Sequence, residues 1–132
     1  MLQYQGLVED EILSHRDLLA DLTGRGLIIH ISGAEVFASE VGAIADKYNV
    51  GLGEAECIAI GLKSGCAVAS DDRKARIAAE TELGRSRIIG SIGLLAESVA
   101  AGVILPADAY TSYSIMKAKG AHLPRLSEDY FV

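Results

Sequence analysis

Hydrophobic and polar positions follow two different periods along this chain. Short apolar runs bounded by glycine, serine or charged residues predict strands at residues 27–31, 66–70 and 87–90. Longer stretches with apolar residues three or four positions apart predict helices at residues 8–22, 34–48, 54–63, 72–83, 92–101 and 107–119. Strands that alternate with helices in this way predict an α/β fold with a parallel sheet.

The length and composition predict a single domain over residues 1–132, with half of the residues hydrophobic. No apolar run approaches the roughly 18 residues of a membrane span, and the N-terminus lacks the pattern of an export signal. We therefore expect a cytoplasmic protein without a membrane partner. The formal charge of −6 argues against broad electrostatic binding of nucleic acid. It does not exclude a nuclease, because carboxylates gathered at a metal site also lower the net charge.

Two carboxylates open the nearly all-apolar helix predicted at residues 54–63. An unpaired ionised carboxylate on a buried element loses its hydration, and a divalent cation can offset that loss. Glu54 and Glu56 lie about 200° apart around the helix, so they cannot both face one site. We predict Glu54 as a site residue and Glu56 as a second candidate. The alternative is that both acids only complement the positive end of the helix dipole.

A second pair of carboxylates follows the strand predicted at residues 66–70. Ligands of parallel sheets bind outside the C-terminal ends of the strands, which is where Asp71 and Asp72 lie in the sequence. We expect Asp71 to cap the next helix, which leaves Asp72 to point into the crevice. The alternative is that Asp71 is only a cap and that Asp72 only stabilises the first helical turn.

Basic residues come directly after this acidic pair. Arg73, Lys74 and Arg76 would either contact the phosphates of a nucleic acid or form a solvated helix face, and the sequence favours neither. The acids at residues 9–11 open the first predicted helix and have a similar alternative as a solvated first turn. One of these acids is required if the site is to hold a third carboxylate.

Several motifs together resemble those of the PIN domain family, and within it a subfamily of PIN-like predicted nucleases. The segments that match are Gly-Leu-Gly-Glu-Ala-Glu-Cys-Ile-Ala-Ile at residues 51–60, Ala-Ser-Asp-Asp-Arg-Lys-Ala-Arg at 69–76, Ile-Ile-Gly-Ser-Ile-Gly-Leu-Leu at 88–95, and the stretch at 117–123. The resemblance extends from about Val8 onward and implies a three-layer α/β/α fold with a short parallel sheet.

The resemblance also implies an activity and a set of site residues. It predicts an endoribonuclease that depends on Mg²⁺ or Mn²⁺, often the toxin of a toxin–antitoxin pair, with RNA as substrate and an antitoxin protein as partner. Matched by motif, Glu11, Glu54 and Asp72 would hold the metal and be catalytic, with Asp71 and Glu56 as auxiliary metal ligands. Arg73, Lys74 and Arg76 would then contact the RNA.

The chain departs from the family pattern at its start. That pattern begins with a strand ending in an aspartate, whereas residues 1–7 contain no acid. We therefore expect an N-terminally truncated PIN-like fold without the first strand. A missing strand would expose the backbone of its neighbour and favour pairing with another chain, as in a homodimer. The alternative function is a catalytically incomplete PIN-like domain that acts as a protein-binding or oligomerising module.

Overall fold

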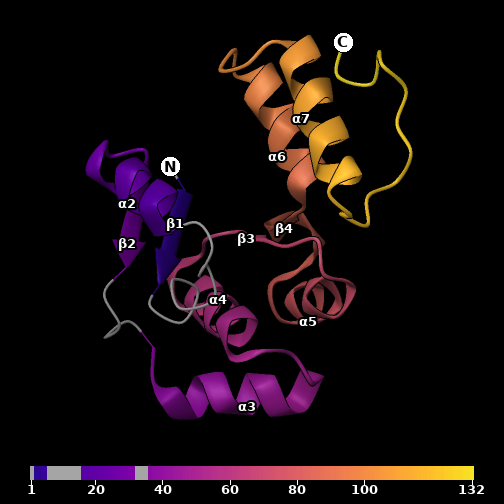
Figure 1. The fold of residues 1–132 in the computed structure, drawn as a ribbon. Helices are drawn as coiled ribbons and strands as arrows, with labels where there is room; N and C mark the ends of the chain where they lie inside the picture. Colours follow the sequence, from indigo (N-terminus) through magenta and orange to yellow (C-terminus); the bar gives the residue numbers. More distant parts are fainter. Residues whose placement is uncertain (1, 6–15, 32–35) are drawn as a thin grey trace.

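A computed structural model of the chain describes residues 2–5, 16–31 and 36–132 (Figure 1). The elements, in chain order, are β1 (Leu2–Gln5), α2 (Arg16–Gly24), β2 (Ile28–Ile31), α3 (Ala38–Tyr48), α4 (Leu52–Ser64), β3 (Val68–Ala69), α5 (Arg73–Leu83), the 3₁₀ turn η2 (Arg85–Arg87), β4 (Ile88–Ile89), α6 (Ser91–Ala100) and α7 (Pro106–Ala118). Helices α4 to α7 begin and end within two residues of their predicted bounds. Most of the first predicted helix lies outside the described residues.

The described strands form two parallel pairs, which confirms the predicted α/β class with short parallel strands. In the second pair Val68 is opposite Ile88 and Ala69 is opposite Ile89. The N–H of Ser70 donates to the carbonyl of Ile89 at 2.9 Å and extends this ladder by one residue. The acidic pair Asp71–Asp72 therefore follows directly on the end of a paired strand.

The prediction that the first strand is missing is wrong. Strand β1 runs parallel to β2, with Leu2 opposite Ile28 and Gln5 opposite Ile31. Its sequence, Leu-Gln-Tyr-Gln, alternates apolar and polar residues, and this period of two is the local signal for a strand. The strand carries no carboxylate, so it does not supply the aspartate with which the family's first strand ends.

The main apolar core lies among α3, α4 and α5, which neighbour one another in Figure 1. Ala55 and Ile58 of α4 and Ala78 of α5 are fully buried. A Cβ atom added at Gly61 would lie 2.9 Å from Leu83 Cδ1, at the end of α5. The glycine thus allows α4 to pack closely on the end of α5, and this packing fixes α4 relative to the loop that carries the acidic pair.

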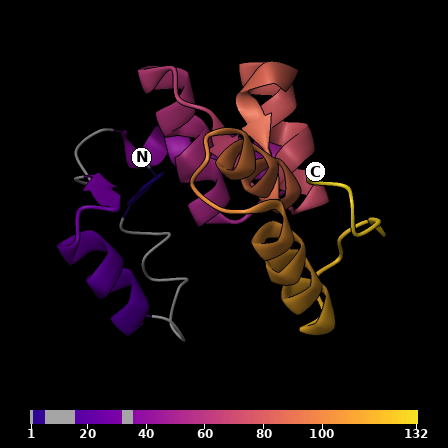
Figure 2. The same cartoon turned by 90° about the horizontal axis from the view of Figure 1, so that it is seen from above.

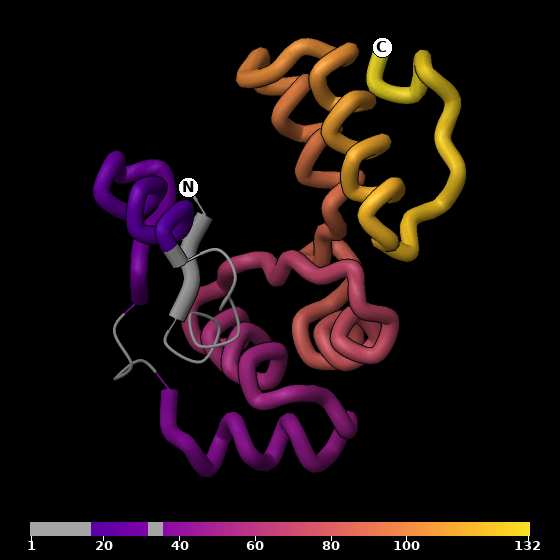
Figure 3. Tube along the Cα trace, in the orientation of Figure 1, coloured from indigo at the N-terminus to yellow at the C-terminus, as the bar shows by residue number. Residues whose placement is uncertain are grey.

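A second, smaller apolar cluster joins α6, α7 and the C-terminal tail, and its buried members are Ala109, Tyr113 and Phe131. The hydroxyl of Tyr113 donates to the carbonyl of Pro124 at 2.7 Å and accepts from the N–H of Leu126 at 3.0 Å. These two bonds hold the tail alongside α7, as the tube in Figure 3 shows. The tail and α2 lie on opposite sides of the molecule in both views (Figures 1 and 2).

Among the helices within the described ranges, none has the length and apolar character needed to cross a bilayer.

Candidate active site

Glu54 lies in the first turn of α4, where its carboxylate has a defined position. The backbone N–H of Gly51, which precedes the helix, donates to Glu54 Oε2 at 2.9 Å. This reciprocal contact is half of a capping box and stabilises the start of the helix. The side chain is half-buried and lines a cavity of about 160 Å³. The other residues that line this cavity are Gly53, Cys57, Ile58, Val68, Ala69, Ser70 and Ala75.

Asp72 is bonded to two residues that line the same cavity. Its Oδ2 accepts from the N–H of Ala75 at 2.9 Å, and its own N–H donates to Ser70 Oγ at 3.1 Å. Asp72 is therefore the N-cap of α5 and lies beside the wall of the cavity that Glu54 lines. The end of β3 and the start of α4 bring these two predicted site residues to one region of the molecule.

The prediction that Asp71 caps α5 is wrong, because Asp72 occupies that position. Asp71 instead extends to the start of α6, where its Oδ1 accepts from the N–H of Ser91 at 2.8 Å and its Oδ2 accepts from the Ser91 hydroxyl. Gly90 permits this approach, since a Cβ atom there would lie 2.8 Å from Asp71 Oδ1. By local sequence alone either aspartate could be the N-cap of α5, and the contact of Asp71 with α6 leaves that position to Asp72. Asp71 lines a different cavity from Glu54.

The remaining predicted acids are less closely associated with Glu54. Among the described residues, Glu56 is the one charged residue that is buried, with 6% of its surface exposed. It does not line the cavity of Glu54. This separation agrees with the angular spacing of the two glutamates on α4. Glu11 lies outside the described residues. Within the ranges that the structure covers, no group of three or more His, Cys, Asp or Glu side chains is arranged to hold a metal ion.

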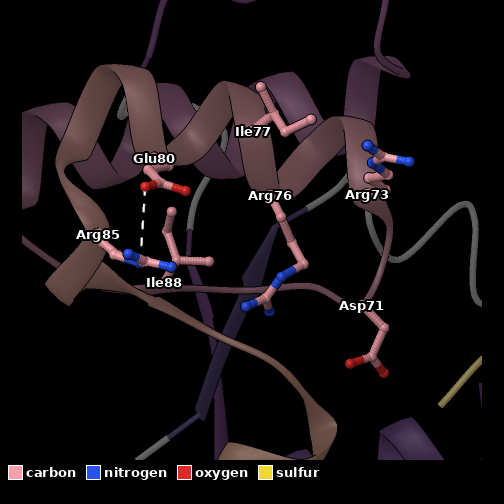
Figure 4. Close-up of a pocket in the computed structure, with 7 residues that line it drawn as sticks. All are labelled: Asp71, Arg73, Arg76, Ile77, Glu80, Arg85 and Ile88. Carbon is pink, nitrogen blue, oxygen red and sulfur yellow. Dashed lines mark ion pairs between the residues drawn. The ribbon is translucent and has the colours of Figure 1, made fainter. Parts of the chain in front are cut away.

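Basic side chains gather at a second and larger cavity of about 430 Å³ beside α5 (Figure 4). Its lining residues are Asp71, Arg73, Arg76, Ile77, Glu80, Arg85 and Ile88. Arg73 and Arg76 were predicted from the sequence, whereas Lys74 does not line the cavity. Arg85 was missed, because it comes from η2, beyond the end of the helix that carries the motif.

The cavity of the arginines and that of Glu54 share a boundary. Arg76 Nη1 donates to the backbone carbonyl of Ser70 at 2.9 Å, and Ser70 also lines the cavity of Glu54. The segment from Ser70 to Asp72 therefore separates a carboxylate-lined cavity from an arginine-lined one. Adjacent sites of negative and positive charge are what a metal ion and a phosphate group, respectively, would require.

A family model described as a PIN domain matches residues 10–127, which is most of the chain. The chain belongs to the PIN domain family. Comparisons with curated proteins and with solved structures found no significant match. PIN domains have a nuclease-like fold and generally use divalent metal ions, and the matched region of this PIN domain includes Glu11, Glu54 and Asp72. Strand β1 precedes the matched region.

Proposed function

We propose that this PIN domain is an endoribonuclease that hydrolyses RNA phosphodiester bonds with Mg²⁺ or Mn²⁺. The observation that supports this proposal is that Glu54, at the start of α4, lines a cavity beside which Asp72 lies. Asp72, the N-cap of α5, does not line this cavity itself but is hydrogen-bonded to Ser70 and Ala75, which do. A local capping role for each acid does not require the two side chains to lie near the same cavity.

The bonding of the two carboxylates suits a metal ligand. Each uses one oxygen to accept a backbone N–H, from Gly51 for Glu54 and from Ala75 for Asp72. No hydrogen bond occupies the second oxygen of either group within the described part of the chain. The bonded oxygen fixes the carboxylate, and the second oxygen is available to a cation. Mg²⁺ binds through one or two carboxylates together with water and substrate phosphate, so this sparse pair fits it.

A bound divalent cation at this position would polarise the phosphoryl group and lower the pKa of a coordinated water. The role of the protein's own residues is to hold the carboxylates in place and to orient the RNA. We propose Glu11 as a third carboxylate of this site. Glu56 and Asp71, the auxiliary metal ligands that the resemblance predicts, do not line the cavity of Glu54, so the proposed site does not include them. Basic residues of α5, Arg73 and Arg76 among them, would position the substrate strand.

A non-catalytic, partner-binding role is the second candidate. It is favoured by the absence of a carboxylate from β1 and by the lack of a three-ligand group among the described residues. We further propose, from the resemblance, a toxin role with an antitoxin partner, and this proposal shares the same first test because a nuclease toxin requires an active metal site. A cytoplasmic location stays a prediction from the composition. The homodimer was predicted from a missing first strand, and the pairing of β1 with β2 removes that argument for it.

Titration calorimetry with Mn²⁺ tests the metal site directly. We expect the wild-type protein to bind Mn²⁺ and Asp72→Asn to lose most of that binding, since an amide cannot replace an anionic ligand. Asn remains a good N-cap, so the variant should keep α5 intact. Glu97→Gln is the matched control, because Glu97 is an exposed acid on α6. No binding by the wild type at millimolar Mn²⁺, or equal binding by Asp72→Asn, would refute the proposal in favour of the second candidate.

A further inference from the structure

The cavity beside α5, here called the arginine pocket, has a charge distribution unlike that of the whole chain. The protein has a formal charge of −6, yet three guanidinium groups line this one opening, from Arg73, Arg76 and Arg85. They come from two different elements, since α5 supplies the first two and η2 supplies Arg85. In Figure 4 the side chains of Arg76 and Arg85 extend to the same side of α5, with Ile88 between them in this view.

The two acids at the arginine pocket do not neutralise it. Both oxygens of Asp71 accept hydrogen bonds from Ser91, so its charge is partly satisfied at the start of α6. Glu80 Oε1 lies 3.8 Å from Arg85 Nε, and their side chains are 51% and 91% exposed. An exposed ion pair of this kind contributes little and is easily exchanged for another anion. The side chain of Arg73 makes no hydrogen bond or ion pair with any other described residue.

The geometry of the arginines suits a phosphate group, whose several oxygens can accept hydrogen bonds, better than a monatomic anion. Arg76 is anchored through Nη1 to the carbonyl of Ser70, which leaves its other N–H groups for a ligand. The planar guanidinium matches two phosphate oxygens at once, and several such groups around one cavity favour a phosphodiester. Ile77 and Ile88 provide an apolar wall against which a sugar or base can pack.

We infer that the arginine pocket binds a backbone phosphate of single-stranded RNA, next to the phosphate that would be cleaved. The Ser70–Asp72 segment lies between the pocket and the cavity of Glu54, so one strand crossing this segment would present successive phosphates to both sites. This inference rests on the proposed function for the identity of the ligand. It assigns Arg85 a binding role that the sequence motif does not include, and it leaves Lys74 outside the pocket.

Fluorescence anisotropy with a labelled single-stranded RNA of roughly ten nucleotides tests the inference. The measurement is made without divalent metal, so that it does not depend on cleavage. We expect Arg85→Ala to weaken binding by roughly tenfold and to reduce the slope of log affinity against log salt by about 0.7. Arg85→Lys should keep the slope but lose part of the affinity. Arg25→Ala, which removes an exposed arginine on the surface beyond α2, should bind RNA like the wild type.

Each result gives a distinct answer. Unchanged affinity and slope in Arg85→Ala, or an equal loss in Arg25→Ala, would overturn the inference even if the protein cleaves RNA. Loss of binding in Arg85→Ala alone supports it even if no cleavage is detected, in which case the proposed nuclease activity fails by itself. Inorganic phosphate is added as a competitor; displacement of the RNA only at high millimolar phosphate supports a strand-binding site. Complete displacement at micromolar phosphate would identify a site for free phosphate and overturn the inference.

Discussion

The carboxylate of Asp71 accepts hydrogen bonds from both the backbone N–H and the hydroxyl of Ser91, the first residue of α6. This contact joins the loop after β3 to the helix after β4, across the parallel pair that the two strands form. The contact also gives the two neighbouring aspartates different roles. Asp71 stabilises the fold at this junction, while Asp72 remains beside the cavity that Glu54 lines.

Removal of the Asp71 carboxylate should destabilise the protein. Asp71→Ala leaves the N–H and hydroxyl of Ser91 without their acceptor, and we expect a loss of about 1–2 kcal/mol in the free energy of unfolding, measured with urea. Ser91→Ala should cost less, because only the hydroxyl bond is lost. A double-mutant cycle should give a coupling energy between the two positions. Additive effects of the two substitutions would contradict this contact.

Gly90→Ala should be destabilising because its new methyl group has no room. The Cβ atom would lie 2.8 Å from Asp71 Oδ1 and 2.9 Å from Arg76 Nη1, so at least one of these side chains must move. Both atoms are at the ends of flexible side chains, so the cost comes from weakening their hydrogen bonds to Ser91 and Ser70. We expect a loss of about 1 kcal/mol in thermal or urea unfolding. Gly42→Ala is the matched control, since no atom lies within 4 Å of its added Cβ within α3. That substitution should stabilise the protein by up to about 1 kcal/mol.

Glu54→Gln and Asp72→Asn should separate activity from stability. Both amides can still accept the backbone N–H groups of Gly51 and Ala75, so unfolding free energies should change by less than about 0.5 kcal/mol. RNA cleavage should fall by at least about 100-fold in each variant, because each loses an anionic metal ligand. Cleavage is measured on a fluorescent RNA with Mg²⁺ or Mn²⁺. Cleavage at the wild-type rate by either variant would refute the assigned roles.

Glu82 should make the stability depend on pH in the acid range. Hydrogen bonds from the Tyr48 hydroxyl and the Lys47 ammonium hold the pKa of the Glu82 carboxyl below its usual value of 4.5. A folded-state pKa below the unfolded one gives stability that is present above pH 4.5 and lost as the pH falls through the folded value. We expect Glu82→Gln to cost about 1 kcal/mol at neutral pH.

The difference between Glu82→Gln and the wild type should vanish in acid, where the carboxyl of the wild type is protonated. Urea unfolding at a series of pH values measures it. A constant difference at every pH would show that Glu82 acts through packing and not through its charge. Tyr48→Phe should reduce, but not abolish, the contribution of Glu82 to the pH dependence of the unfolding free energy, because the hydrogen bond from Lys47 remains.

Local sequence patterns predicted the elements well, because helix and strand periods and glycine stops act over a few residues. Asn49, predicted as a helix stop, ends α3 in the left-handed conformation with φ of 51°. The joint role of Glu54 and Asp72 as site residues stays a prediction; Asp72 is bonded to Ser70 and Ala75, which line the cavity of Glu54.

The features of the fold and the site that the sequence does not predict depend on contacts between distant segments. The choice between Asp71 and Asp72 as the cap of α5 is settled by Ser91, which is 20 residues away. Arg85 reaches the arginine pocket because η2 turns back beside α5, and no local motif marks that turn. Strand β1 alternates apolar and polar residues but is not predicted from the family pattern, because that pattern requires a first strand that ends in an acid.

The second apolar cluster shares none of its buried residues with the main core, and α6 contributes no fully buried side chain. If this C-terminal unit opens, the Asp71 carboxylate loses both of its donors at Ser91 and becomes a free negative charge at the mouth of the arginine pocket. Opening of α6 and α7 and occupancy of the pocket by an anion therefore oppose each other. We therefore expect an anion bound among the arginines to slow hydrogen exchange in α6 and α7, although it does not touch them.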